Sequence, residues 1–289
     1  MIKDEIKDDT RSMLRDAFNQ LSRDSELSLA DYSYISSCQH AIELVLSRYY
    51  TNFTTVLPGA YSRHTMTAPL AGSVIDMFVL FKEKHSEAAN VASLLKRFKN
   101  TIKPEYPESW LAKRTSALIV KMDNFVFRIQ PGFVTGHSHY LVPAQTWDGW
   151  EKYDSMVYKN AFARMNAKHK GRLVHVIRMI KAWNRLNGNV FDDYYLELMT
   201  VDVLMDYEIR DYADTLCHVF RSMVYQVVFR KTDPACVGMD VEGLRDVEDL
   251  VKAMQLVHTA YRTAKQAIEF RENSSLSTIS YSNWEKLFP

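Results

Sequence analysis

A glycine turn followed by an apolar strand with one carboxylate constrains this chain more than any other segment. The turn reads Pro58-Gly59-Ala60-Tyr61-Ser62-Arg63-His64-Thr65, and the strand reads VIDMFVLF over residues 74–81. Glycine lets a phosphate approach the backbone closely, where successive N–H groups bind its oxygens. Phosphoryl transfer with two metal ions also needs carboxylates two residues apart on one strand, which point to the same face. By itself, the segment is either an ordinary glycine turn or part of a phosphate-transfer site in which only one carboxylate of such a pair, Asp76, is present.

Composition narrows the class of protein. A chain of 289 residues is long enough for two packed lobes. Its 36 basic and 35 acidic residues give no bulk signal for nucleic acid or for a membrane surface. Cys38, Cys217 and Cys236 are too far apart for a zinc motif and odd in number, which favours a reducing compartment. Apolar runs stay short of the roughly 20 residues that a membrane span needs. We therefore expect a cytoplasmic protein.

The hydrophobic pattern changes partway along the chain. Strands are predicted by alternation and by short apolar runs at residues 53–57, 74–81, 117–122, 125–130 and 140–143. Helices are predicted near residues 3–22, 29–50, 86–101, 155–168, 170–187, 193–207, 209–230 and 246–272. Trp284 and Phe288 near the end of the chain are expected to pack back onto it. The pattern predicts an α+β fold with a core lobe over residues 1–150, a helical lobe over residues 151–289 and a cleft between them.

An ordered set of motifs carries a resemblance to a known family. After the glycine turn come Pro69 and the strand with Asp76; the later members are Phe127-Arg128-Ile129-Gln130-Pro131-Gly132-Phe133, Tyr140-Leu141-Val142-Pro143, Lys181-Ala182-Trp183-Asn184, Tyr194-Tyr195-Leu196-Glu197 and Asp233-Pro234. Over nearly its whole length the chain resembles the SMODS-type domain of cGAS/DncV-like nucleotidyltransferases (CD-NTases). The block at residues 178–197 is its most specific part.

The resemblance implies a fold and an activity. The fold is a nucleotidyltransferase (polymerase beta-like) mixed sheet with helices, joined to a helical lobe. Intact members make cyclic di- or trinucleotides from nucleoside triphosphates with Mg²⁺, and these signals switch on effector proteins during phage infection. The residues implied to bind nucleotide are Gly59, Ala60, Tyr61, Arg63, Arg178, Lys181 and Tyr194.

The departures from the family pattern lie where the chemistry belongs. Ala60 replaces a serine and has no hydroxyl for a phosphate. Val74 replaces the first aspartate and offers no oxygen to Mg²⁺, which prefers oxygen ligands. Arg128 replaces the third carboxylate with a permanent cation. Only Asp76 remains as a catalytic acid and candidate metal ligand, and its alternative role is an ion pair with Arg128. Of the other nearby acids, Glu83 lies past the strand and Asp123 in a turn, so neither is a good substitute.

A basic stripe on a predicted helix has two interpretations. Arg178, Lys181 and Arg185 stand at i, i+3 and i+7, on one helical face. They either contact phosphate, as the resemblance implies for Lys181, or form a solvated charged face. Tyr194 either stacks on a base or packs in the core.

Three hypotheses about function follow. The leading one is a catalytically degenerate CD-NTase of antiphage (CBASS-type) signalling that binds a nucleotide or a regulatory protein partner without transferring nucleotides. The second is an active Mg²⁺-dependent synthase with a non-standard set of acids. The third is a protein-interaction module that binds no nucleotide. Whether the chain is an enzyme stays open at this point.

Overall fold

The structure, a computed structural model, describes residues 2–82, 90–112, 116–144, 149–236, 240–244, 247–271 and 276–289. Backbone contacts divide the chain into two compact units. The sheet unit comprises Leu27–Ala161 and Asp233–Met239, and the helical unit comprises Met1–Glu26, Phe162–Thr232 and Asp240–Pro289. Each unit is described by itself.

The sheet unit is built on a mixed sheet. Its strands are β1 (Phe53–Val56), β2 (Val74–Phe81), β3 (Trp110–Leu111), β4 (Leu118–Lys121), β5 (Val126–Val134), β6 (His139–Pro143) and β7 (Trp150–Asp154). Their order is β1-β2-β5-β4-β3, and β6 pairs with both β5 and β7. Only the pairing of β2 with β5 is parallel among the described strands, and the others are antiparallel. The mixed sheet confirms the predicted α+β class.

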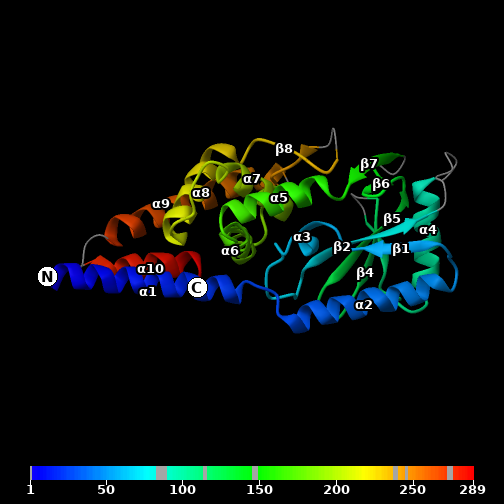
Figure 1. Ribbon diagram of the computed structural model, residues 1–289, viewed down its shortest axis with the longest axis horizontal. Helices are drawn as coiled ribbons and strands as arrows, with labels where there is room; N and C mark the ends of the chain where they lie inside the picture. The colour runs from blue at the N-terminus through cyan, green and yellow to red at the C-terminus, as the bar shows by residue number, and fades with distance from the viewer. Residues whose placement is uncertain are drawn as a thin grey trace. The chain divides into compact units, whose positions relative to one another are not determined.

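Two helices cover one face of this sheet, as Figure 1 shows. α2 (Leu29–Ser47) and α4 (Val91–Ile102) bury their apolar sides against alternate residues of β2 and β5. In β2 the residues that join this core are Ile75, Met77, Val79 and Phe81. Because side chains alternate along a strand, Asp76, Phe78 and Leu80 point to the opposite face. We call it the open face; its apolar cluster is small and comprises Phe78, Leu80 and Val142.

A capping box starts α2 and fixes where the chain enters the helix-covered face. Ser28 Oγ accepts a hydrogen bond from the Asp31 backbone N–H at 3.1 Å, and the Asp31 carboxylate accepts one from the Ser28 backbone N–H at 2.9 Å. This reciprocal pair satisfies two N–H groups that lack partners within the helix.

The helical unit packs around aromatic side chains. Its helices are α1 (Ile2–Asp24), α6 (Arg172–Leu186), α7 (Asp193–Val203), α8 (Tyr212–Gln226), α9 (Leu250–Arg271) and α10 (Ser277–Leu287). α5 (Val157–Lys168) spans the boundary between the units, and a small hairpin (β8, Lys231–Thr232; β9, Asp240–Val241) and a 3-10 turn (Val247–Asp249) precede α9. The indole of Trp183 stacks on Phe191 and meets Phe220 edge-on at 5.1 Å.

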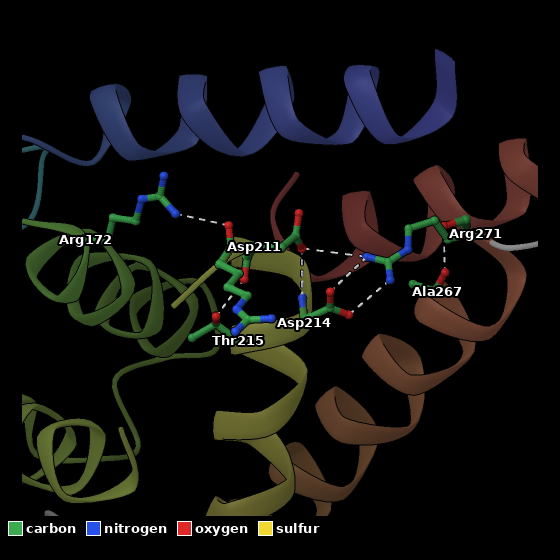
Figure 2. Close-up of polar contacts among 8 residues, drawn as sticks. Arg172, Asp211, Asp214, Thr215, Ala267 and Arg271 are labelled. Carbon is green, nitrogen blue, oxygen red and sulfur yellow. Dashed lines mark hydrogen bonds and ion pairs between the residues drawn. The ribbon is translucent and has the colours of Figure 1, made fainter. Parts of the chain in front are cut away.

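Polar contacts fasten α9 to the start of α8, as Figure 2 shows. The Arg271 guanidinium donates to both carboxylate oxygens of Asp214, at 3.1 and 3.3 Å. Its Nη1 also lies 3.7 Å from Asp211 Oδ1, and Asp211 caps α8. The chain then returns through α10, where Trp284 is buried and packs edge-on against Phe18 of α1. The prediction that the tail packs back is confirmed.

The compact units differ from the predicted division at residue 150. The first helix groups with the helical unit rather than with the sheet, and residues 233–239 group with the sheet unit. Strands β3 and β7 and helix α10 were not predicted as elements, and part of the predicted helix at 86–101 lies outside the described residues. In the part of the chain that the structure describes, no helix combines the length and the apolar character needed to span a membrane.

Candidate functional site

The candidate site lies on the open face, where β2 and β5 run in parallel. The register places Asp76 directly beside Arg128. The Arg128 Nε lies 2.5 Å from Asp76 Oδ1, and the two side chains are 38% and 25% exposed. The ion pair considered as the alternative for Asp76 is therefore confirmed. A guanidinium now stands where the resemblance predicts a third carboxylate.

The glycine turn adjoins this ion pair. Gly59 has a φ of +69°, a left-handed conformation that glycine adopts without steric cost. A Cβ placed on Gly59 would come within 3.3 Å of Asp76 Oδ2, so the turn passes directly over the carboxylate. The following residues form the single helical turn α3 (Gly59–Ser62), in which Ser62 Oγ donates to the Gly59 carbonyl at 3.0 Å. The turn and the retained acid therefore belong to one site.

The other predicted residues of the turn point into the protein. Ala60 and Tyr61 are partly buried against the main core, and burial raises the pKa of Tyr61. Arg63 is buried, with its guanidinium 4.7 Å from the centre of the Tyr158 ring, in a cation–π contact. Arg63 therefore packs inside the sheet unit, against a ring of α5. Nucleotide contact by Ala60, Tyr61 and Arg63 stays a prediction.

The described residues around Asp76 do not form a site for divalent cations. Val74, on the same face as Asp76, is 53% exposed and has no oxygen ligand to offer. The carboxylate of Asp76 is engaged by a cation that would repel a metal ion. Across the described ranges, no three His, Cys, Asp or Glu side chains are grouped so that they could hold a metal ion. A pair of metal ions needs bridging carboxylates, and one paired aspartate does not supply them.

Sequence reasoning missed two acids of the sheet unit that stand near the open face. Glu151 of β7 pairs in register with Val142, a residue of the open-face cluster. Its Oε2 is buried without a hydrogen-bond partner in the described part of the chain. Burial, and then the charge of Asp233, raises the pKa of Glu151. In the sequence, Asp233 was noted only as part of the Asp233-Pro234 motif and not as an acid of the site. The aromatic residues Trp150 and Tyr153 beside Glu151 were the only local signal of a strand there, and they do not alternate with the charged residues.

Tyr153 of β7 lies on the open face, where the charges of Arg63, Asp233 and Asp76 act on its hydroxyl. It packs on the open-face cluster beside Phe78, with ring centres 5.2 Å apart. Burial raises the pKa of Tyr153, Arg63 opposes that rise, and Asp233 and Asp76 add to it. The open face thus has a charged environment with both signs, but its acids are not gathered for metal binding.

The other acids that sequence analysis considered do not complete the site. Asp123 accepts a hydrogen bond from Tyr34 of α2 at 2.9 Å. That contact gives Asp123 a structural role at the helix-covered side. Glu83 lies outside the described residues.

The basic stripe on α6 is buried. Lys181 is 3% exposed and its Nζ lies 2.9 Å from Oε2 of Glu197, which is fully buried on α7. Arg178 is also buried, and its Nη2 lies 3.1 Å from Glu26 Oε1. The alternative of a solvated charged face is therefore wrong for these two residues. Both side chains are buried and form ion pairs with carboxylates of the same unit.

The remaining predicted contacts of the helical unit are untested. Burial lowers the pKa of Arg185, and the charge of Asp193 opposes that change. Tyr194 lies half-buried in the first turn of α7, where its backbone N–H donates to Asp192. Phosphate contact by Arg178 or Lys181 and base stacking by Tyr194 stay predictions.

The fold defines the class of protein. A parallel pair of central strands beneath a glycine turn, extended by antiparallel strands and followed by helices, is the α+β core of a nucleotidyltransferase of the polymerase beta-like type. A sequence model of the SMODS family (Second Messenger Oligonucleotide or Dinucleotide Synthetase domain) matches residues 13–166, more than half of the chain. The chain belongs to this family, and its relatives of known structure are CD-NTases.

One relative in sequence is a probable cyclic nucleotide synthase of Bacillus cereus (strain VD146). It is 25% identical over 122 residues, which are 39% of this chain and 37% of that protein. The similarity therefore spans little more than a third of either chain.

Solved structures show the same fold over a larger share of the chain. CdnC of E. coli MS115-1, solved in a complex with HORMA-deltaN and with ATP, has a TM-score of 0.69 at 13% identity and covers 93% of this chain and 96% of its own. CdnG of Bradyrhizobium diazoefficiens in complex with GTP has a TM-score of 0.64 at 11% identity, with 94% and 98% covered. At such identities the likeness establishes the fold alone.

Proposed function

We propose that this protein is a catalytically degenerate member of its family, which binds a nucleotide or a partner protein in antiphage cyclic-nucleotide signalling and transfers no nucleotide. The observation that carries the proposal is the Asp76–Arg128 ion pair at the position of the metal-binding carboxylates. Two divalent cations must be bridged by carboxylates for this chemistry, and here the one acid of the set is neutralised by a guanidinium. Val74 adds a second loss on the same face.

The relatives support the choice of ligands. CdnC has been solved with ATP and, separately, with HORMA-deltaN, and CdnG with GTP. We propose that this chain, which shares their fold, binds a ligand of one of these two kinds. We therefore place nucleoside triphosphates first among the ligands to be tested, and a protein partner second.

A product assay tests the proposal directly. Purified protein is incubated with labelled ATP, GTP, CTP and UTP in Mg²⁺ or Mn²⁺, and products are resolved after phosphatase treatment. We expect no phosphatase-resistant product from the natural chain. The double variant Val74→Asp/Arg128→Asp recreates the missing carboxylates on an intact scaffold, and a product from it alone would identify these two positions as the cause of inactivity.

One observation favours a second function, an active synthase with a non-standard set of acids. Glu151 stands in register with Val142 of the open-face cluster, and its buried Oε2 has no hydrogen-bond partner among the described residues. Burial, and then the charge of Asp233, raises the pKa of Glu151. Under this alternative the natural chain makes a product. Asp76→Ala abolishes it, and so does Glu151→Gln or Asp233→Asn as a single variant. Asp123→Asn is the matched control, because Asp123 contacts Tyr34. A product with that pattern of losses would overturn the proposal of degeneracy.

A further inference from the structure

We infer that Arg128 takes the place of a divalent cation in this site, so that the site binds the phosphates of a nucleotide without a metal ion. The inference rests on the proposed function and deepens it, because it states how a nucleotide is held once the metal-binding acids are lost.

Arg128 places a positive charge beside Asp76 on the open face. Asp76 and Arg128 are direct neighbours on the parallel strands β2 and β5, and their side chains meet on the open face. In a metal site, a cation would lie between carboxylates from these two strands. Here the positive charge is covalently part of β5 and is present whether or not Mg²⁺ is in solution, because a guanidinium does not lose its proton in proteins.

The guanidinium of Arg128 is chemically suited to bind phosphate. A guanidinium offers planar N–H donors that match phosphate oxygens, and charge-assisted hydrogen bonds of this kind are stronger than neutral ones. The Arg128 side chain is more than a third exposed, so that a ligand can reach it from the open face. Gly59 packs against the same Asp76 carboxylate, which brings the turn beside this charge.

Glu151 is too far from Arg128 to repel a phosphate bound there strongly. Glu151 lies on β7, which is separated from β5 by β6. Two strand spacings are about 10 Å, close to the Debye length at moderate salt. β6 pairs with the far end of β5, at Phe133 and Val134, so that Arg128 is further still from this acid. The repulsion of an incoming phosphate by Glu151 is therefore weak beside Arg128.

Mn²⁺ alone is the first probe, because its binding is measured without any ligand or activity. Titration of the full chain, followed by electron paramagnetic resonance, should show no saturable Mn²⁺ site in the natural protein. Val74→Asp/Arg128→Asp should gain one, and adding Asp76→Ala to that variant should remove it. Mn²⁺ binding by the natural chain that Asp76→Ala abolishes would overturn the inference. Failure of the double variant to gain a site, in protein with an unchanged circular dichroism spectrum, would also count against Arg128 as the excluding group.

ATP is the second probe, titrated by calorimetry in EDTA and then in Mg²⁺. We expect binding in EDTA that is at least as tight as in Mg²⁺, since chelated Mg²⁺ neutralises part of the phosphate charge that Arg128 attracts. Arg128→Ala should weaken it by about tenfold or more, and Arg128→Lys should restore part of the affinity. Arg230→Ala is the matched control, since Arg230 is an exposed, ion-paired arginine of the helical unit. ATP binding that appears only with Mg²⁺, or no binding in either buffer, would contradict the inference.

The two proposals fail in different assays. A cyclic product from the natural chain would refute the loss of catalysis, whereas a Mn²⁺ site at Asp76 would refute the replacement of the metal. A chain that makes no product and yet binds Mn²⁺ at Asp76 would leave the first proposal standing and remove the second.

Discussion

Two ion pairs of this molecule have the same chemistry and opposite surroundings. Lys181 and Glu197 meet inside the helical unit, where both side chains are almost completely removed from water. Asp76 and Arg128 meet on the open face of the sheet, where both remain partly exposed. A buried charge without its partner is costly, whereas an exposed pair contributes little to stability. The comparison indicates that the first pair is part of the folded interior, whereas solvent reaches both side chains of the second.

The comparison also shows why family motifs and physical roles need separate tests. Lys181 belongs to the block that most resembles the family, yet it forms an ion pair with a buried glutamate of α7. Arg128 departs from the family, yet it stands at the centre of the site. A motif match therefore predicts where a residue lies more securely than what its charge does.

The largest effect is expected from breaking the buried pair. Lys181→Met leaves the Glu197 carboxylate buried and uncompensated, which should lower the free energy of unfolding by about 3–5 kcal/mol. Urea denaturation followed by circular dichroism measures the loss. The double variant Lys181→Met/Glu197→Met should recover part of it, because no buried charge remains. A loss below about 1 kcal/mol for the single variant would show that the pair is not held as the structure describes, and would remove the contrast with Asp76–Arg128.

Much of the sheet could be predicted because its signals are local. Strand β2 was predicted over residues 74–81 and lies at Val74–Phe81, since its apolar run is bounded by Gly72 and Ser73 on one side and by charged residues on the other. The Asp76–Arg128 pair was an alternative in the sequence analysis, because opposite charges on strands that must pair are complementary. β7 was missed because the segment WEKYD is short and three of its five residues are charged, as an edge strand can be.

Burial in the helical unit could not be predicted from local pattern. Charges at i, i+3 and i+7 on α6 follow the spacing of a solvated face, and only the position of Glu197 on α7 and of Glu26 after α1 shows that two of them are buried. Partners that come from distant segments leave no mark on the helix itself. For the same reason the grouping of α1 with the C-terminal helices was not visible in its amphipathic pattern.

The next effect in size is the loss of stability when histidines of the helical unit take up a proton. Burial lowers the pKa of His169 and of His175, with Lys168 and Arg178 respectively adding to the effect. Since unfolded histidine titrates near 6.5, the stability from these neutral rings is complete above that pH and is lost as the pH falls below it. The free energy of unfolding should drop by up to about 1.4 kcal/mol per pH unit for each ring that titrates.

Chemical denaturation at about pH 7.5, 6.5 and 5.5 measures this dependence, in a window above the titration of ordinary carboxyl groups. The variant His169→Gln/His175→Gln should reduce it, because neither side chain takes up a proton; burial also lowers the pKa of His218, which accounts for a remaining part of the dependence. His137→Gln is a matched control on an exposed residue of the sheet unit. A stability that is constant over this range in the natural chain would contradict the assigned burial of the two rings.

A smaller effect tests how closely the glycine turn is held against the exposed pair. Gly59→Ala introduces a side chain at a positive φ and brings its Cβ to 3.3 Å from the Asp76 carboxylate. We expect a loss of about 1–2 kcal/mol from the left-handed backbone, measured by thermal and urea denaturation. Gly72→Ala separates the two causes, because Gly72 also has a positive φ but has open space around its Cβ position. Equal losses for both variants would mean that the contact with Asp76 adds nothing.

The smallest effect is expected from the Asp76–Arg128 pair, which is only partly buried. Asp76→Asn and Arg128→Gln each remove one charge and keep a polar side chain of similar size, and each should change the free energy of unfolding by at most about 1 kcal/mol. The change should shrink further between about 0.1 and 1 M salt, where the Debye length falls from about 10 to 3 Å. Denaturation of both variants at the two salt concentrations measures it beside the Lys181 variant. A loss that approaches the value for Lys181→Met and is insensitive to salt would mean that Asp76–Arg128 is a structural pair as well. The positive charge at residue 128 would then be needed for folding, and the case for its service to a phosphate ligand would rest on nucleotide binding alone.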